Sequence, residues 1–358
     1  MPYLNQNKKS EVEKRPTEVT AGIKAFSRDE LKGVCAELGQ PAFRAKQLEQ
    51  WIYGKGVREY AEMTNLSKQF REQLDEKYPL LFPEVVTKQT SVDGTRKYLV
   101  RFSDGVTVET VGIPSKNRLT VCFSTQAGCP IRCSFCATGR SGLIRNLAPG
   151  EMVDQIRIVA EDFAMRPTNA VAMGQGEPFL NYDNTIAALQ FMNSKDGLEI
   201  GARHITVSTS GILPQIRRFA AEPEQFTLAV SLHSAVQETR NELMPGVRQY
   251  TLERLQDSLK SYIDSTGRRV TFEYAMIDGV NDSNADLSAL QKFCRKLLCH
   301  VNLIPVNPVR GSKYQPSEYE RIAFFNERLN QNGIECTIRN SRGADIDGAC
   351  GQLKQKGF

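Results

Sequence analysis

The sequence predicts an α/β protein whose main part is an incomplete (β/α)6-type barrel, preceded by a small helical domain and a β-meander connector. From residue 119 onward, strand-like runs alternate with amphipathic helical stretches, the pattern of parallel strands covered by helices. No glycine-rich nucleotide fingerprint follows the first of these strands, so we favour a partial barrel over a doubly wound sheet. At 358 residues the chain is long enough for one large domain with a smaller appendage.

Charge and cysteine content limit the class of protein. The 46 Lys and Arg residues against 41 Asp and Glu give a net charge of +5, which permits nucleic-acid binding without requiring it. Apolar runs are too short to span a membrane, and the start of the chain is polar and charged, unlike a signal peptide. We therefore expect a cytoplasmic protein with no membrane partner. Nine cysteines without a secretory signal favour thiols and metal ligation over a disulfide framework.

Residues 1–22 are expected to form a disordered tail, because they are charged and carry few large apolar groups. Residues 23–84 form the predicted helical domain, which opens with a capping-box pattern at Ser27 and continues with helices around Trp51 and from about Asn65. Basic residues are interleaved with the apolar faces of these helices: Arg44, Lys46, Lys55, Arg58, Lys68 and Arg71. They could form an ordinary solvated surface or contact an RNA backbone, and the residues alone leave both interpretations open.

Residues 85–118 form the predicted connector. Apolar and polar residues alternate there around Asp93-Gly94 and Asp104-Gly105, which predicts a hairpin or a three-stranded meander. The connector also carries Glu109, just before the first barrel strand.

Residues 119–345 form the predicted barrel, and residues 346–358 a C-terminal segment. Strands are expected near 119–125, 169–173, 204–209, 226–232, 270–277, 300–305 and 335–339. Helices are expected at 152–163, 186–192, 212–219, 252–263, 287–298 and 319–329.

Small and polar residues gather where these strands end, and barrel chemistry collects in the loops at the carboxyl ends of strands. The loops in question carry a group of three cysteines after the first strand, Gly174–Pro178 after the second, Ser208–Gly211, Ser231–His233 and Asn307-Pro308. We therefore expect a ligand site along one rim of the barrel.

Cys129, Cys133 and Cys136 fall within eight residues in a C-x3-C-x2-C spacing. Three thiolates on a short loop can bind three irons of a cubic [4Fe–4S] cluster, and no fourth cysteine follows nearby. The fourth iron would then be open to chelate the amino and carboxylate groups of an amino-acid-like cofactor. Zinc is the alternative, but zinc cysteines usually come as two C-x2-C pairs, and the sequence has no second pair.

The rim residues have ordinary interpretations as well as functional ones. Gly176 lets the backbone approach a ligand closely, and Glu177 or the loop carbonyls could accept hydrogen bonds from an ammonium group. Ser208 and Ser231 could donate to a carboxylate or to ribose hydroxyls, and Asn307 to ribose or adenine. Each could equally be a simple turn or strand-end residue, and His233 could be a hydrogen-bonded structural histidine. The only other histidines are His204 and His300, which excludes a histidine-rich metal site.

Two further cysteines are candidate nucleophiles. Cys350 lies in a glycine-flanked stretch that we expect to be mobile, and Cys122 lies on the first barrel strand. The remaining four are expected to be inert packing residues inside helices and strands: Cys35, Cys294, Cys299 and Cys336.

The cysteine loop, with Phe135 before its third cysteine, resembles the signature of the radical S-adenosylmethionine (SAM) superfamily. Beyond that loop, the chain resembles the RlmN/Cfr family of radical SAM RNA methyltransferases over residues 24–353, and within it the RlmN members. The stretches that carry this resemblance are Val108–Val111, Cys129–Gly139, Met173–Pro178, Ser208–Gly211, Ser231–His233, Asn302–Pro305, Ser341–Gly343 and Asp345–Leu353. Gln175 departs from the methionine expected at its position.

The resemblance implies methylation of adenine C2 in 23S rRNA, at the peptidyl transferase centre, and of the adenosine 3′ of the anticodon in tRNA. It implies a [4Fe–4S] cluster, two SAM molecules, and SAM contacts from Gly176, Glu177, Ser208, Ser231, Leu232, His233 and Asn307. It also implies a methyl-cysteine at Cys350, a resolving Cys122 that ends in a disulfide with Cys350, and a proton acceptor at Glu109. A monomer and an electron donor such as flavodoxin are further expectations.

Three alternatives stay open. One is a Cfr-type enzyme that methylates adenine C8 and confers antibiotic resistance. Another is a zinc-stabilised, non-catalytic RNA-binding protein. The third is a radical SAM enzyme with a small-molecule substrate, which the basic helical domain makes less attractive.

Overall fold

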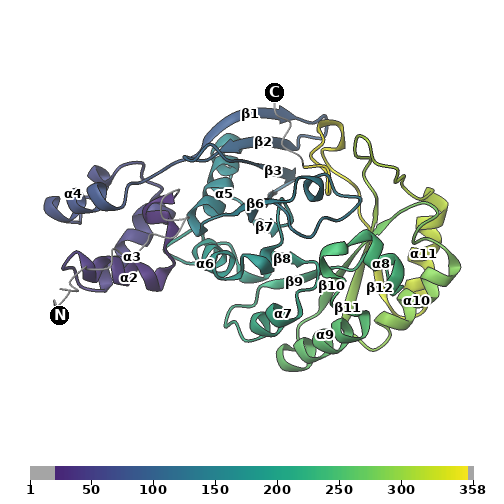
Figure 1. Ribbon diagram of the computed structural model, residues 1–358. Helices are drawn as coiled ribbons and strands as arrows, with labels where there is room; N and C mark the ends of the chain where they lie inside the picture. The colour runs from purple at the N-terminus through teal and green to yellow at the C-terminus, as the bar shows by residue number, and fades with distance from the viewer. Residues whose placement is uncertain (1–20, 354–358) are drawn as a thin grey trace, which may run out of the picture.

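The computed structural model describes residues 21–353, and ten of its strands form one continuous sheet in the order β1-β2-β3-β4-β7-β8-β9-β10-β11-β12 (Figure 1). Neighbours from β4 to β12 are parallel. These strands are β4 (Arg118–Cys122), β7 (Asn169–Ala172), β8 (Ile205–Thr209), β9 (Thr227–Ser231), β10 (Val270–Met276), β11 (Cys299–Pro305) and β12 (Glu335–Ile338). Because β1 and β12 are the two edges of this sheet, it does not close, and the prediction of an incomplete barrel is confirmed.

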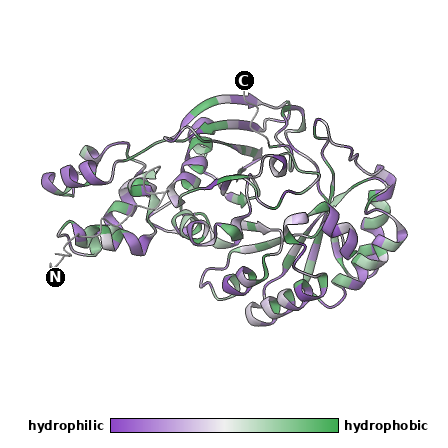
Figure 2. Cartoon of the chain, viewed as in Figure 1, coloured by the Kyte–Doolittle hydropathy of each residue, from purple (hydrophilic) through white to green (hydrophobic). Residues whose placement is uncertain are grey.

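Helices connect the successive parallel strands, since parallel neighbours need a crossover. They are α5 (Pro149–Phe163), α6 (Tyr182–Asn193), α7 (Leu213–Ala220), α8 (Gln237–Leu243), α9 (Leu252–Thr266), α10 (Asn284–Cys294) and α11 (Tyr319–Gln331). Their apolar faces and the strands form a single core. In Figure 2 the central strands carry hydrophobic residues, whereas the outlying helix α4 (Lys68–Lys77) is largely hydrophilic. Within the described part of the chain, none of the helices has the length and apolarity needed to cross a membrane.

The predicted meander is present but is part of the barrel sheet. Strands β1 (Glu84–Thr90), β2 (Arg96–Arg101) and β3 (Thr107–Ser115) pair antiparallel, and β3 continues antiparallel onto β4. Gly94 and Gly105 make the two turns, with φ values of 84° and 81° that favour glycine. The meander therefore extends one edge of the barrel, and it places Glu109 two strands away from β7.

The N-terminal helices lie to one side of the barrel (Figure 1). Helix α2 (Arg28–Glu37) begins with the predicted capping box, in which Ser27 and Glu30 bond each other's backbone N–H groups. Helix α3 (Phe43–Glu49) runs into a π-helical turn (Gln50–Lys55).

The predicted tail boundary at residue 22 is wrong. Residues 1–20 lie outside the described part of the chain, but Ala21 is only 2% exposed and Gly22 forms a β-bridge with Leu80. These two residues are small enough to pack beneath the helices, and the charge pattern of the preceding residues could not indicate this. Next to them, the Lys24 ammonium lies 2.8 Å from Asp154 of α5, a buried ion pair that joins the helical region to the barrel.

Candidate active site

The three cysteines of the spaced motif lie on the loop that follows β4. The chain leaves β4, forms the short strand β5 (Gln126–Gly128), passes through the cysteines and returns as β6 (Leu143–Asn146) paired with β5. The Cys129 N–H donates to the Gly142 carbonyl at 2.8 Å, which closes the base of the loop. All three thiols are half-buried and line one cavity.

The thiols suit a cluster better than a single ion. A zinc ion needs all its ligands within about 2.3 Å of one point. A structural zinc site also usually has four protein ligands, and the loop offers three cysteines. A [4Fe–4S] cube binds each thiolate at a different iron, so its cysteines need only face a common space. The shared cavity of Cys129, Cys133 and Cys136 meets that requirement.

This first cavity opens at the carboxyl ends of the strands. Its walls include the cysteine loop and most of the rim residues that the sequence singled out: Gly176, Glu177, Ser208, Ser231, His233 and Asn307. Leu232 is the exception, because its side chain is fully buried in the core and its N–H donates to the carbonyl of Glu273. The cavity therefore brings the three thiols and these polar side chains to one common space.

Glu177 has a structural role that the sequence did not reveal. Its carboxylate accepts hydrogen bonds from the Phe179 N–H, the Thr209 hydroxyl, and the N–H and hydroxyl of Ser210, at 2.6–3.0 Å. These four bonds fill the acceptor positions of a carboxylate. Burial raises the pKa of Glu177, and the bonds from Ser210 and Thr209 oppose that rise. The carbonyls of the loop are therefore better placed than this side chain to accept hydrogen bonds from an ammonium group.

His233 faces the first cavity as a neutral imidazole. Its Nδ1 accepts the Ala275 N–H at 3.0 Å, so the ring proton is on Nε2. Burial, helped by the charge of Arg240, lowers the pKa of His233 to about 3. The ring also packs edge-on against Phe135 at 4.8 Å between centroids. His233 can thus donate one hydrogen bond from Nε2 and stays uncharged at neutral pH.

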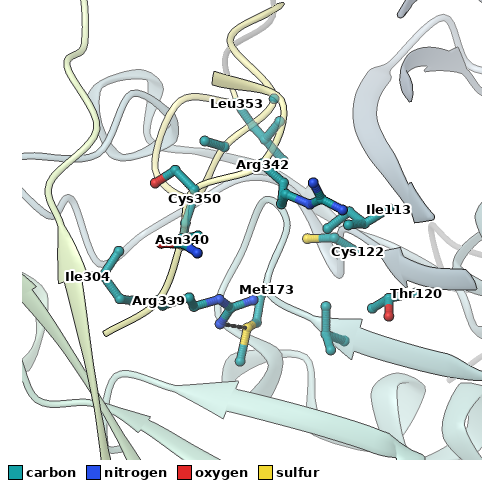
Figure 3. Close-up of a pocket in the computed structure, with 14 residues that line it drawn as sticks. Ile113, Thr120, Cys122, Met173, Ile304, Arg339, Asn340, Arg342, Cys350 and Leu353 are labelled. Carbon is teal, nitrogen blue, oxygen red and sulfur yellow. Dashed lines mark hydrogen bonds between the residues drawn. The ribbon is translucent and has the colours of Figure 1, made fainter. Parts of the chain in front are cut away.

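A second cavity holds the two candidate nucleophiles (Figure 3). Cys122 and Cys350 both line it, and Cys350 also lines the first cavity. Ile113, Val171 and Ile304 make the other walls of the second cavity partly apolar. A planar ring could therefore lie against both thiols, while Cys350 alone reaches the cofactor side.

Both thiols are free and protonated at neutral pH. Desolvation raises the pKa of Cys122 to about 12 and that of Cys350 to about 11, and the charge of Arg339 opposes both shifts. The disulfide implied by the resemblance is not formed in this structure. Cys35, Cys294, Cys299 and Cys336 are buried, as expected of packing residues.

The stretch around Cys350 is held in place, although the sequence predicts a mobile loop. The Ala137 N–H donates to the Gly351 carbonyl at 2.8 Å, and the Thr138 hydroxyl to the Leu353 carbonyl at 2.7 Å. The Asn307 side chain donates to the Cys350 carbonyl at 3.0 Å. Cys350 is therefore anchored to the cysteine loop itself, and Asn307, expected to bind ribose or adenine, contacts Cys350 in this structure.

Glu109 lies on β3, buried, with its carboxylate 3.1 Å from the Lys97 ammonium. It lines neither of the two cavities. Val111 pairs with Cys122 across β3 and β4, and residues two apart on a strand share a face. Glu109 is therefore on the same face of the sheet as Cys122. Lys97 also donates to the Asp347 carbonyl at 3.3 Å, which links Glu109 to the segment that carries Cys350.

Two arginines of the site were not found from the sequence. Arg240 on α8 is 1% exposed, and its guanidinium donates to the Ser210 carbonyl at 2.6 Å. Arg339, directly after β12, lines both cavities. Neither has a motif around it, and only the position of Arg339 at a strand end could have indicated a role.

A partial parallel barrel with three clustered cysteines after its first strand defines a radical SAM enzyme, whose cofactors are a [4Fe–4S] cluster and SAM, and residues 123–289 match the radical SAM superfamily. Residues 22–79 match the "Ribosomal RNA large subunit methyltransferase N-terminal domain". The chain belongs to the RlmN family.

Relatives from two distant bacteria illustrate the match. The chain is 45% identical over 331 residues to a protein of Clostridium novyi, covering 92% of this chain and 96% of the relative. It is 47% identical over 333 residues to one of Nostoc punctiforme, covering 91% of each. Both relatives bear the name "Probable dual-specificity RNA methyltransferase RlmN".

A solved structure matches at nearly full length. The crystal structure of a radical SAM methyltransferase from Sphaerobacter thermophilus superposes with a TM-score of 0.87 and 44% identity. The match covers 94% of this chain and 100% of that one.

Proposed function

We propose that this protein methylates C2 of an adenosine in 23S rRNA, at the peptidyl transferase centre, and of the adenosine 3′ of the anticodon in tRNA. The observation that carries the proposal is the position of Cys350, which lines both the cofactor cavity and the cavity that contains Cys122. A sulfur in that position can receive a carbon on one side and deliver it on the other.

The choice of RNA as substrate is supported by the family and by the N-terminal helices. The relatives' names describe two RNA specificities, which would be the rRNA and tRNA adenosines. Lys46, Lys55, Arg58 and Lys68 are exposed on the N-terminal helices and turns. Three of them form ion pairs with Asp196, Glu161 and Glu72, which a phosphate would have to replace. Exposed cations of this kind bind phosphates. We propose that residues 23–84 form an RNA-binding module, followed by the connector at 85–118, the barrel at 119–345 and the thiol segment at 346–358.

The reaction explains the need for these cofactors. The C2–H of adenine is neither acidic nor nucleophilic, so direct polar methyl transfer to C2 fails. When bound, the cluster on Cys129, Cys133 and Cys136 together with SAM would supply a methyl group and, after reduction by a donor such as flavodoxin, a carbon radical able to abstract hydrogen. Loop carbonyls beside Gly176 and the Nε2–H of His233 would orient the cofactor.

Cys350 would act as the carrier. Its thiol loses a proton and gains a methyl group. This methyl group then loses one hydrogen atom, which leaves a carbon-centred radical bonded to the Cys350 sulfur. That carbon adds to C2 of the base, so the RNA becomes covalently bound to Cys350. Binding the base against the walls of the second cavity would hold C2 beside this sulfur.

Cys122 and Glu109 would complete the reaction. The thiolate of Cys122 attacks the sulfur of Cys350, an S–S bond forms and the C–S bond breaks. The electron pair of the broken bond and one proton turn the released CH2 into the methyl group, and the unpaired electron of the adduct is given back, so that the electron first supplied by the reductant is not consumed. Glu109 is proposed to accept the proton lost from C2. Its place on the Cys122 face of the sheet supports this role, although in this structure it is paired with Lys97.

The test uses protein reconstituted under anaerobic conditions with iron and sulfide, incubated with SAM, a reductant and either rRNA fragments or tRNA. Mass spectrometry of the nucleosides should find 2-methyladenosine. Cys350→Ala should abolish it while SAM is still cleaved to 5′-deoxyadenosine. Production of 8-methyladenosine, methylation by Cys350→Ala, or a protein that binds only zinc would each contradict the proposal.

A further inference from the structure

The wall between the two cavities contains one cation whose role the proposed reaction does not yet use. Arg339 lines both cavities together with Cys350, and its backbone N–H is fixed by the Leu303 carbonyl at 2.8 Å. Its guanidinium lies 3.9 Å from the Met173 sulfur (Figure 3). It also lies 3.7 Å from a Glu273 oxygen. Among residues 21–353, it donates no hydrogen bond to an oxygen atom, so its strong donors remain available to a ligand.

Only one oxygen of the Glu273 carboxyl faces the Arg339 guanidinium. Its carboxyl is 5% exposed, and one oxygen accepts the Asn302 side-chain N–H at 3.0 Å. Its other oxygen accepts no hydrogen bond within the described residues, and it is the oxygen that faces Arg339. Burial raises the pKa of Glu273 and the charge of Arg339 lowers it, so the arginine favours the charged form of this carboxyl. The 3.7 Å contact with Glu273 therefore orients the Arg339 guanidinium without forming a hydrogen bond to its N–H groups.

We propose that Arg339 is a further catalytic residue, which donates a hydrogen bond to a ring nitrogen next to the reacting carbon of the adenine. The inference rests on the proposed function, because it assumes that C2 is the carbon presented to Cys350. In adenine, C2 lies between N1 and N3, and both are hydrogen-bond acceptors. When C2 faces Cys350, these nitrogens necessarily lie on the same side of the base as the thiol. A donor-only guanidinium in the same wall complements them, whereas the 6-amino group is itself a donor.

The hydrogen bond would assist the step in which the carbon–carbon bond forms. One electron of the carbon radical on Cys350 and one electron of the ring π system make the new bond, and the unpaired electron that remains is delocalised over the ring nitrogens. A cationic donor at N1 or N3 stabilises the charge that develops there. Arg339 keeps its proton throughout, so the step needs no additional reactant.

The test combines Arg339→Gln with RNA that carries 1-deazaadenosine or 3-deazaadenosine at the target position. On unmodified RNA, the variant should form 2-methyladenosine roughly 10- to 100-fold more slowly than the wild type, the loss typical of one charged donor. On the analogue that lacks the contacted nitrogen, variant and wild type should react at the same rate. On the other analogue, the variant's loss should persist. The intrinsic effect of each analogue on C2 reactivity cancels, because each comparison uses one RNA.

Arg342 provides the matched control. It is a second arginine of the same cavity, but its guanidinium donates to the Pro114 carbonyl at 3.2 Å and lies 3.8 Å from Asp93. Any loss in Arg342→Gln should therefore be equal on all three RNAs. The inference is overturned if Arg339→Gln also loses the same rate factor on all three RNAs.

Two further measurements separate this role from others. All these rates are measured in single turnovers of protein already methylated on Cys350, as checked by intact-protein mass spectrometry, because loss of the Arg339 charge is itself expected to slow methylation of the thiol. If Arg339→Gln reacts with unmodified RNA as fast as the wild type once Cys350 is methylated, Arg339 acts only on the thiol and the inference is overturned. If turnover of an analogue is too slow to measure, the same comparison is made with dissociation constants of the three RNAs. Failure of the proposed function is a different result, because it would appear as wild-type protein that makes no 2-methyladenosine.

Discussion

Cys350 is an exposed residue, yet desolvation by the surrounding protein makes its thiol a weak acid. Desolvation raises its pKa to about 11, with Arg339 opposing the shift, so little thiolate is present at neutral pH before a ligand binds. Reactivity would then increase when a positively charged sulfonium approaches the sulfur, because an opposite charge favours the thiolate.

This pKa predicts the pH dependence of Cys350 alkylation. Below its pKa, thiolate increases roughly tenfold per pH unit, so iodoacetamide labelling should keep rising up to about pH 11. A peptide spanning residues 345–353 should instead level off above about pH 8.5, the ordinary range of cysteine. Peptide-resolved mass spectrometry measures both, with circular dichroism to confirm that the protein stays folded. A plateau near pH 8.5 in the folded protein would contradict the desolvated site.

At the scale of elements, one aspartate joins the meander to the barrel. Asp162, at the end of α5, accepts hydrogen bonds at 2.7 Å from Lys88 of β1 and from Arg96 and Tyr98 of β2. Burial alone would raise the pKa of Asp162, but these bonds outweigh it and lower the pKa to about 2. Asp162 therefore holds β1 and β2 onto the helix that follows the cysteine loop, and β2 pairs with β3, the strand that carries Glu109.

Asp162→Asn should lower the free energy of unfolding by about 1–3 kcal/mol, because three donors lose a charged acceptor. The wild-type contribution should be complete above about pH 4 and lost as the pH falls through about 2, because the folded carboxyl ionises more readily than the unfolded one. Urea titrations at several pH values measure both effects. Asp183→Asn, which breaks an exposed pair with Arg218, should cost only about 0–1 kcal/mol. Equal losses in the two variants would contradict this account.

Elements were predicted better than their contacts. The alternation of apolar runs placed each parallel strand to within a few residues, and the capping box at Ser27 and both Asp-Gly turns are present. These signals are local, since they depend on neighbours in the sequence. The continuity of the meander with the barrel sheet, and the anchoring of the Cys350 segment on the cysteine loop, depend on hydrogen bonds between distant residues. Such contacts leave no pattern in a single sequence.

The residues of the candidate site also fall into those that local sequence patterns reveal and those that only the fold reveals. Cys129, Cys133 and Cys136 could be found because their close spacing in the sequence is enough to place three thiolates on one loop, where they can bind a cluster. Arg339 could not, because its significance comes from lying between two cavities formed by several strands. Glu177 was found, but the four donors that occupy its carboxylate come from loops that only the fold brings together.

At the scale of the whole molecule, the buried pair of Lys24 and Asp154 connects the N-terminal helices to the barrel. The ammonium lies 2.8 and 2.9 Å from the two carboxylate oxygens and 3.6 Å from the Phe82 ring centroid. The pKa of Lys24 is lowered by burial and that of Asp154 is raised by it, so each group depends on the other to remain charged.

Lys24→Met should destabilise the protein by about 3–5 kcal/mol, because it leaves a buried carboxylate unpaired. Adding Asp154→Leu should recover much of that loss. The exposed pair of Lys32 and Asp29 is the control, and Lys32→Met should change stability by less than about 1 kcal/mol. Thermal unfolding monitored by circular dichroism measures these changes in stability. A loss below about 1 kcal/mol in Lys24→Met would show that other contacts hold the N-terminal helices to the barrel.

In the proposed reaction, the Cys350 sulfur links the cofactor to the substrate. The cysteine loop positions Cys350 through its backbone, the barrel rim encloses the cofactor cavity, and the meander with β4 brings Cys122 to the opposite side. If this account is right, the carbon added to RNA passes through a covalent bond to Cys350.

The most direct test follows that carbon in the Cys122→Ala variant, using SAM with a trideuterated methyl group. Without Cys122 the last step cannot occur, so a nucleotide should remain joined to Cys350 through a carbon that keeps two of its three deuterium atoms. Mass spectrometry of the digested adduct measures this. Free RNA carrying an intact trideuteromethyl group, with Cys350 unmodified, would contradict the account.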